Sequence, residues 1–259
     1  MHLAIPATRH QQILSILHNQ GEIRLSAICK QFEVTPMTAW RDLKQLEELG
    51  LLRRIHGGAK ESGAANREFN FESKSGEAGG AKALIAQAAV KAFVHEGDVV
   101  AMEGGTSVAA LVDALPEQRI SILTNSMPVA LRLRQRRPSL PVQVIGGSLS
   151  TVSGNTIGPE ALKQIRNCRI STTFLSATGW DPLHGPTDPN PLEIEVKRAF
   201  AACSDRVVLL MDHRKFTVTS ASIVLHPRRV HALVTDQQPP PEAADLLGSH
   251  EVRILVGGE

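Results

Sequence analysis

The chain is poor in aromatic residues and cysteine, and it lacks long apolar runs. Aromatics make up 3% of its 259 residues, with no Tyr, which disfavours functions that stack single-stranded nucleic acid on rings. Three cysteines (Cys29, Cys168 and Cys203) without CxxC spacing disfavour a disulfide framework or zinc ribbon and favour a reducing cytosol. No run reaches the roughly 20 apolar residues of a membrane helix, and "MHLAIPATRH" does not resemble a signal peptide. We therefore expect a cytoplasmic protein without membrane contact.

Basic charge is concentrated at the N-terminal end. Residues 1–60 carry eight Lys or Arg and five Asp or Glu, a net charge of +3, whereas residues 61–259 carry twenty and twenty-one, a net charge of −1. This excess is modest for a nucleic-acid binder. Charge alone therefore does not identify the partner.

The sequence divides into three segments. Residues 1–60 show helical periodicity, residues 61–80 are rich in Gly, Ser and charge and predict a linker, and residues 81–259 alternate short apolar runs with helical patterns. The runs expected to be strands are "DVVAM", "SILTN", "VQVIGG", "TTFLSA", "VVLLMD" and "HALVTD". They predict an α/β fold, with an open, largely parallel sheet and helices on both faces.

The first segment predicts a winged helix-turn-helix. Ile13, Ile16 and Leu17 mark a first helix that ends near Gly21, "EIRL" is a short extended piece, and "SAICKQF" is a second, short helix. Thr35 caps the third helix, with Pro36 at its first position and a stop at Gly50. "LLRRIHGGA" then predicts a strand that closes through Gly57 and Gly58, and this segment is the wing of the predicted motif. In a helix-turn-helix the second helix of the motif enters the major groove of DNA.

The polar face of the third helix is the candidate DNA-reading surface. Helical spacing places Trp40, one of two tryptophans, on that face and away from the apolar stripe. The alternative is a small helical bundle whose polar face contacts proteins, but the wing arginines favour phosphate binding. The predicted DNA-binding residues are Thr35, Met37, Thr38, Trp40, Arg41, Lys44, Arg53, Arg54 and His56.

Polar and glycine-rich turns follow several predicted strands of the third segment. In "AMEGGTSVAAL", glycines allow close backbone approach, and N–H groups and hydroxyls at a helix start can hold an anion. Such turns are common, but the carboxyl ends of parallel strands share one edge, where ligands bind. The predicted effector-binding residues are Glu103, Gly104, Gly105, Thr106, Ser107, Thr124, Asn125, Ser126, Gly146, Gly147, Glu193, Lys197, Asp212 and Lys215. Glu193 and Lys197, one helical turn apart, equally fit an exposed ion pair.

The motifs together resemble those of DeoR-type bacterial transcriptional regulators. The matching residues of the first segment are Val34, Thr35, Thr38, Arg41, Asp42, Leu43, Gly50, Arg54, Gly57, Gly58 and Ala59. Ala39 and Trp40 depart from the usual Ile-Arg that precedes Arg41. "EGDVVAMEGGTSVAAL", "ILTNS", "VIGGSL", "GPEAL", "FLSATG" and "MDHRKF" resemble successive sensor motifs of the same family.

The resemblance implies a specific function. It implies a sensor domain similar to the fold of ribose-5-phosphate isomerase, and a regulator, expected to repress a carbohydrate-metabolism operon, whose binding to operator DNA responds to a phosphorylated sugar. We expect a homo-oligomer, a dimer or tetramer, because paired DNA-binding domains read two half-sites.

An enzyme is the alternative from another class. A sugar-phosphate isomerase needs a carboxylate base, and Glu103, Glu193 or Asp212 could supply one. An isomerase has no use for an attached DNA reader, and no independent catalytic signature is present. The histidines show no metal-ligand spacing. We therefore expect no catalysis, no metal and no cofactor.

Overall fold

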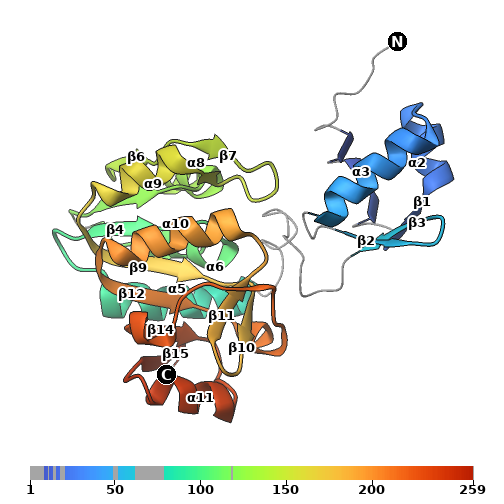
Figure 1. Cartoon of the computed structure of the whole chain (residues 1–259). Helices are drawn as coiled ribbons and strands as arrows, with labels where there is room; N and C mark the ends of the chain where they lie inside the picture. The colour runs from blue at the N-terminus through green and yellow to red at the C-terminus, as the bar shows by residue number, and fades with distance from the viewer. Residues whose placement is uncertain are drawn as a thin grey trace. The chain divides into compact units, whose positions relative to one another are not determined.

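The computed structural model describes residues 9, 10, 12, 13, 16, 17, 21–48, 52–61, 79–117 and 119–258. The chain divides into two compact units, Met1–Arg67 and Glu68–Glu259, drawn in Figure 1. Most of the predicted linker, residues 62–78, lies outside the described residues, as does the predicted helix stop at Gly50. Of the remaining linker positions, Glu61 ends a strand and Gly79 begins a helix.

The N-terminal unit has the predicted winged helix-turn-helix. Its labelled elements are β1 (Glu22–Arg24), α2 (Leu25–Phe32), α3 (Pro36–Glu48), β2 (Leu52–Ile55) and β3 (Gly58–Glu61). The strands form an antiparallel sheet in the order β1-β3-β2. The predicted cap is confirmed, since Thr35 Oγ1 accepts a hydrogen bond from the N–H of Thr38 at 3.2 Å. The buried core comprises Ile13, Leu17, Ile23, Ile28, Ala39, Leu43, Leu46, Leu52 and Ala59.

The second unit is built on a seven-stranded parallel sheet. In sheet order its strands are β15 (Arg253–Val256), β14 (Ala232–Thr235), β12 (Ser204–Leu210), β9 (Ile170–Ser176), β4 (Val99–Met102), β5 (Ser121–Thr124) and β6 (Val142–Val144). Every neighbouring pair in this sheet is parallel. The predicted open α/β fold is confirmed, and each of the six expected runs overlaps one of these strands.

Helices cover both faces of this sheet. One face packs against α5 (Gly79–Phe93), α6 (Thr106–Ala109), α7 (Leu111–Ala114) and α8 (Met127–Arg136). The other packs against α9 (Pro159–Arg166), α10 (Pro191–Ala202) and α11 (Pro241–Gly248); Figure 1 shows α10 in front of the strands. Side chains alternate accordingly: Val100 and Met102 join the α5 cluster, whereas Ala101 joins the α10 cluster.

Two small sheets lie beside the large one and were not predicted. β7 (Ser148–Leu149) pairs with β8 (Thr156–Ile157), and β10 (Gly179–Asp181) pairs with β11 (Gly185–Asp188), which also pairs with β13 (Ser222–Ile223). The short 3-10 helices η2 (His213–Thr217) and η3 (Pro227–Arg229) follow β12 and β13. The connections around β7, β8 and β11 supply part of the site described below.

Candidate functional site

The predicted DNA-reading face of α3 is largely solvent-exposed. Met37 is 73% exposed, and Thr35, Arg41 and Lys44 are also exposed, with Thr38 half-buried. On the wing, Arg53 and His56 are exposed. These residues can therefore reach a DNA duplex, and their roles as contacts remain predictions.

Trp40 does not fit the predicted outward orientation. It is half-buried, and it packs against the apolar core of the N-terminal unit. The guanidinium carbon of Arg54, on β2, lies 5.6 Å from the centroid of the indole ring. The expectation that Trp40 points away from the core is wrong, because helical spacing describes one helix and cannot show a strand packed on its side.

Arg54 is held by α3 as well as by Trp40. Its Nε donates a hydrogen bond to Glu47 Oε2, and its backbone N–H donates to Glu47 Oε1 at 2.8 Å. These two hydrogen bonds hold the pKa of Glu47 below its usual value, so the carboxylate stays charged. The wing and α3 are thus joined through one arginine.

Asp42 anchors the opposite side of α3 through contacts that the sequence did not predict. Arg9 Nε and Nη2 lie 2.6 and 3.1 Å from the two Asp42 oxygens, and His10 Nε2 lies 2.9 Å from Oδ1. Burial alone would raise the pKa of Asp42, but hydrogen bonds from Arg9 and His10 hold it below its usual value. Asp42, one of the motif residues, therefore serves the domain's structure.

Neighbouring side chains leave no room for a Cβ at the two glycines after β4. A Cβ on Gly104 would lie 2.0 Å from Asn155 Oδ1, and a Cβ on Gly105 would lie 2.3 Å from Ser176 Oγ. Gly105 also has a φ of +140°, which disfavours L side chains. Side chains of the protein itself lie against both glycines, and the expected approach of a ligand stays a prediction.

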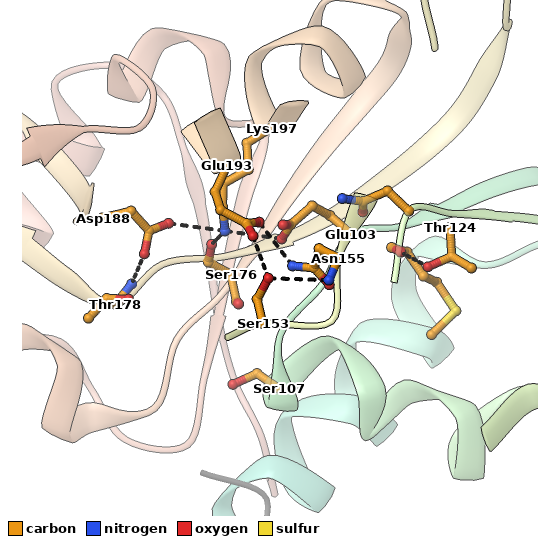
Figure 2. A network of polar contacts seen from close by, with 12 residues as sticks. Glu103, Ser107, Thr124, Ser153, Asn155, Ser176, Thr178, Asp188, Glu193 and Lys197 are labelled. Carbon is orange, nitrogen blue, oxygen red and sulfur yellow. Dashed lines mark hydrogen bonds and ion pairs between the residues drawn. The ribbon is translucent and has the colours of Figure 1, made fainter. Parts of the chain in front are cut away.

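Lys197, on α10, lies in the centre of a buried polar cluster (Figure 2). Its Nζ is 3.1 Å from Glu103 Oε2 and 3.0 Å from Asp188 Oδ2, and it donates a hydrogen bond to the Ser176 carbonyl at 2.7 Å. The hydrogen bonds to Glu103 and Ser176 use two of the three N–H donors of the ammonium, and Asp188 adds an ion pair. The interpretation of Glu193 and Lys197 as an exposed ion pair is wrong, because they are only 6% and 4% exposed.

Three carboxyl groups surround this single lysine. Burial raises the pKa of Glu103 to about 8; Lys197 opposes the shift, whereas Glu193 and Asp188 add to it. Burial alone would lower the pKa of Lys197, but the charges of Asp188, Glu103 and Glu193 outweigh it and hold the pKa above its usual value. The lysine of the cluster therefore stays charged, and burial favours the protonated form of Glu103.

Glu193 connects this cluster to the loop between β7 and β8. Ser153 Oγ donates a hydrogen bond to Glu193 Oε1, and Asn155 Nδ2 donates to Oε2 at 2.9 Å. Ser153, Asn155 and Glu193 lie together in Figure 2. This loop is distant in sequence from the carboxyl ends of β4 and β9, yet it forms a wall of the site.

A cavity of about 80 Å³ opens beside the cluster, at the carboxyl ends of β4 and β9. Its lining includes six of the predicted residues: Gly104, Gly105, Thr106, Glu193, Lys197 and Lys215. The sequence did not predict the remaining lining residues, which are Ser153, Asn155, Ser176, Ala177, Thr178, Asp188, Pro189 and Asn190. Glu103 is fully buried behind Lys197 and is not among the lining residues.

The end of the cavity near β12 carries positive charge. Lys215 lines the cavity and its Nζ lies 3.5 Å from Ser107 Oγ. Asp212 is buried and bonded to Arg214 Nε at 3.0 Å. Burial alone would raise the pKa of Asp212, but the hydrogen bond from Arg214 and the charges of Lys215 and Lys82 hold it below its usual value. Lys82, at the start of α5, was not predicted as a site residue.

The other predicted strand ends have internal partners. Thr124 Oγ1 donates to the Met102 carbonyl at 2.6 Å, Asn125 Nδ2 donates to the Thr156 carbonyl at 3.1 Å, and Ser126 Oγ caps α8. The Gly146 N–H donates to Gln164 Oε1 at 3.0 Å, and a Cβ on Gly147 would lie 2.7 Å from the Ile157 carbonyl. None of these five residues is among those that line the cavity.

In the part of the chain that the structure describes, no group of three or more His, Cys, Asp or Glu could hold a metal ion. No helix there is long and apolar enough to cross a membrane.

Both units match known sequence families. Residues 77–237 match the DeoR C terminal sensor domain, and residues 9–62 match the DeoR-like helix-turn-helix domain. The HTH-type transcriptional regulator YulB of Bacillus subtilis is 29% identical over 250 residues, covering 96% of this chain and 96% of the relative. The lactose phosphotransferase system repressor of Streptococcus mutans is 28% identical over 232 residues, covering 89% and 92%.

A distant likeness to a solved enzyme structure was also found. Ribose 5 phosphate isomerase A from Neisseria gonorrhoeae aligns with a TM-score of 0.38 and 17% identity, covering 54% of this chain and 53% of that chain.

Proposed function

Because the chain belongs to the DeoR family of DNA-binding transcriptional regulators, we propose that it represses a carbohydrate-metabolism operon. We further propose that it releases its operator when a phosphorylated sugar enters the sensor cavity. The predicted regulator is confirmed by the family. The isomerase alternative finds no support, since the relatives that match over nearly the whole chain are named as regulators.

The observation that carries the proposed ligand class is the polar cavity at the carboxyl edge of the sheet. Hydroxyl, amide and carboxylate side chains converge there from Ser153, Asn155, Thr178, Asp188 and Glu193. Such groups match the hydroxyls of a sugar. The name of the S. mutans relative, a repressor of a sugar phosphotransferase system, supports the same class.

The charges suggest an orientation for this ligand. Lys197 is hydrogen-bonded to Glu103 and Ser176 and ion-paired with Asp188, so its charge is already compensated within the cluster. We place the phosphate at Lys215, beside the Ser107 hydroxyl, and the sugar hydroxyls toward Asp188 and Glu193. This arrangement puts negative charge next to the cation at the rim and away from the carboxylates.

The proposed regulation depends on a difference in ligand affinity between two arrangements of the protein. A ligand shifts such an equilibrium only if it binds one arrangement more tightly. We propose that two or more copies of the chain present paired N-terminal units to operator half-sites about one DNA turn apart. The linker predicted at residues 61–80 would transmit the effect of the bound sugar to these units.

A thermal-unfolding screen of the full-length protein tests the ligand class. The panel contains pentose and hexose phosphates, the corresponding free sugars and inorganic phosphate. At about 100 times its dissociation constant, a matching phosphosugar should add about 2.7 kcal/mol of stability to the folded state, or roughly 5–10 °C. Free sugars and inorganic phosphate should give smaller shifts. A panel without any shift would contradict the proposed effector.

A further inference from the structure

We propose that Trp40, Glu47 and Arg54 form a clamp that fixes the wing against α3 and thereby determines operator preference without contacting DNA. The residues lie on two elements, with Trp40 and Glu47 on α3 and Arg54 on β2. The clamp accounts for a tryptophan on a helix face that is otherwise polar. It also assigns the two neighbouring arginines of the wing to different roles.

Strand register places Arg54 on the inner face of the wing. Arg54 lies opposite Ala59 on β3, and Ala59 in turn lies opposite Ile23 on β1. Residues directly opposite in a sheet share a face, and both Ala59 and Ile23 are buried in the core. Arg54 therefore leaves the strand on the side that faces α3.

On α3, the two partners of Arg54 are two helical turns apart. Residues seven positions apart lie on the same face of a helix, so Trp40 and Glu47 flank the arginine from one side. Glu47 accepts hydrogen bonds from the side chain and from the backbone N–H of Arg54. The backbone contact ties the strand to the helix, and the contact with the indole adds a cation–π interaction.

Arg53 provides the contrast within the same strand. It lies opposite Lys60, both residues are exposed, and they point away from the core face. Arg53 is therefore suited to a DNA phosphate, whereas Arg54 is a positioning residue. This assignment replaces the sequence-based expectations that Arg54 contacts a phosphate and that Trp40 contacts DNA.

The test measures DNA affinity across a salt series with the full-length protein. The probes are a duplex enriched from a random pool by the wild-type protein and an unrelated duplex of equal length. Trp40→Leu, Glu47→Gln and Arg54→Lys should each weaken binding to the enriched duplex about fivefold, an effect of the size of one exposed cation–π contact or ion pair. Binding to the unrelated duplex and the salt slope should stay unchanged.

Arg53→Ala is the matched control. Loss of a phosphate contact should weaken binding to both duplexes and reduce the salt slope by about 1. Urea unfolding of each variant establishes that the N-terminal unit remains folded under the assay conditions. The double variant Glu47→Gln/Arg54→Lys should lose no more affinity than either single variant, because both changes break the same contact.

Two results would overturn the clamp. Near-wild-type affinity in Arg54→Lys would identify Arg54 as a simple phosphate contact, which a lysine can replace. An increase in affinity in Glu47→Gln would mark Glu47 as a bystander whose charge merely repels DNA. Both results leave the regulator function itself intact.

Discussion

The ammonium nitrogen of Lys197 lies 3.1 Å from Glu103 Oε2, and both side chains are almost wholly excluded from solvent. Removing the buried cation would leave the buried carboxylates around it without compensation. The surroundings of Lys197, with Asp188 3.0 Å away on its other side, make the lysine a structural centre of the sensor.

Lys197→Met should destabilise the sensor domain by about 3–5 kcal/mol, because Asp188 and Glu193 lose the cation between them. Urea unfolding, followed by circular dichroism, measures the change. Lys163→Met on the exposed surface of α9 is the control and should change stability by no more than about 0.5 kcal/mol. Equal stability of the two variants would contradict the structural role of Lys197.

The stability of the sensor should depend on pH through Glu103. Its pKa is raised from 4.5 to about 8 in the folded state, so between these values the folded protein holds a proton that the unfolded chain has lost. The stability that the folded protein gains by keeping Glu103 protonated is present in full below pH 4.5. It falls by about 1.4 kcal/mol per pH unit as the pH rises and is gone above about pH 8.

Glu103→Gln isolates this contribution, because glutamine imitates the protonated acid and does not titrate. Unfolding free energies at pH 5.5, 6.5 and 7.5 should fall more steeply for the wild type than for Glu103→Gln. Parallel lines would show that Glu103 is ionised throughout this range. Lys197 does not interfere, since its raised pKa affects stability only as the pH rises above 10.5.

Gly104→Ala should damage the cavity without altering the charge of the site. The added Cβ would lie 2.0 Å from Asn155 Oδ1, so Asn155 must leave its hydrogen bond with Glu193. We expect a loss of about 1–3 kcal/mol in unfolding free energy, together with loss of the thermal shift given by a phosphosugar.

Gly80→Ala is the matched control for this substitution. Gly80 lies in α5, and a Cβ there meets nothing within 4 Å. Alanine should leave stability unchanged or raise it by about 0.4–1 kcal/mol. If Gly104→Ala behaved like Gly80→Ala, the close packing of Asn155 over the glycine pair would be wrong.

Lys215→Ala should separate ligand response from DNA binding. Lys215 lines the cavity in the sensor unit, and it is the cation that we assign to the effector phosphate. Fluorescence anisotropy with labelled operator should give nearly wild-type DNA affinity but no response to the phosphosugar. An equal loss of DNA affinity would contradict the division into separate DNA-binding and sensing units.

Local sequence patterns predicted the elements well and the walls of the site only in part. The cap at Thr35 and the strand before Glu103 depend on neighbours in sequence, so spacing alone revealed them. Asn155 and Asp188 reach the cavity through pairings of distant segments, the Ser126–Asn155 bridge and the Asp188–Ser222 strand pairing, which no local pattern encodes.

Contacts between distant segments also explain why some residues were placed wrongly and why the role of others stayed open. Thr124 and Asn125 stand at a strand end as expected, but Asn125 donates a hydrogen bond to the Thr156 carbonyl on β8, and both residues are fully buried. Trp40 lies on the polar side of α3 by helical spacing, yet Arg54 from β2 covers its ring. In each case a second element, distant in sequence, determines the side chain's surroundings.

The central claim is that a phosphorylated sugar in the sensor cavity controls DNA binding. The most direct measurement adds the phosphosugar identified by thermal shift to a preformed complex of the full-length protein with labelled operator. We predict that anisotropy falls to the value of free DNA for the wild type and stays high for Lys215→Ala. A wild-type complex that persists at saturating phosphosugar would contradict the account.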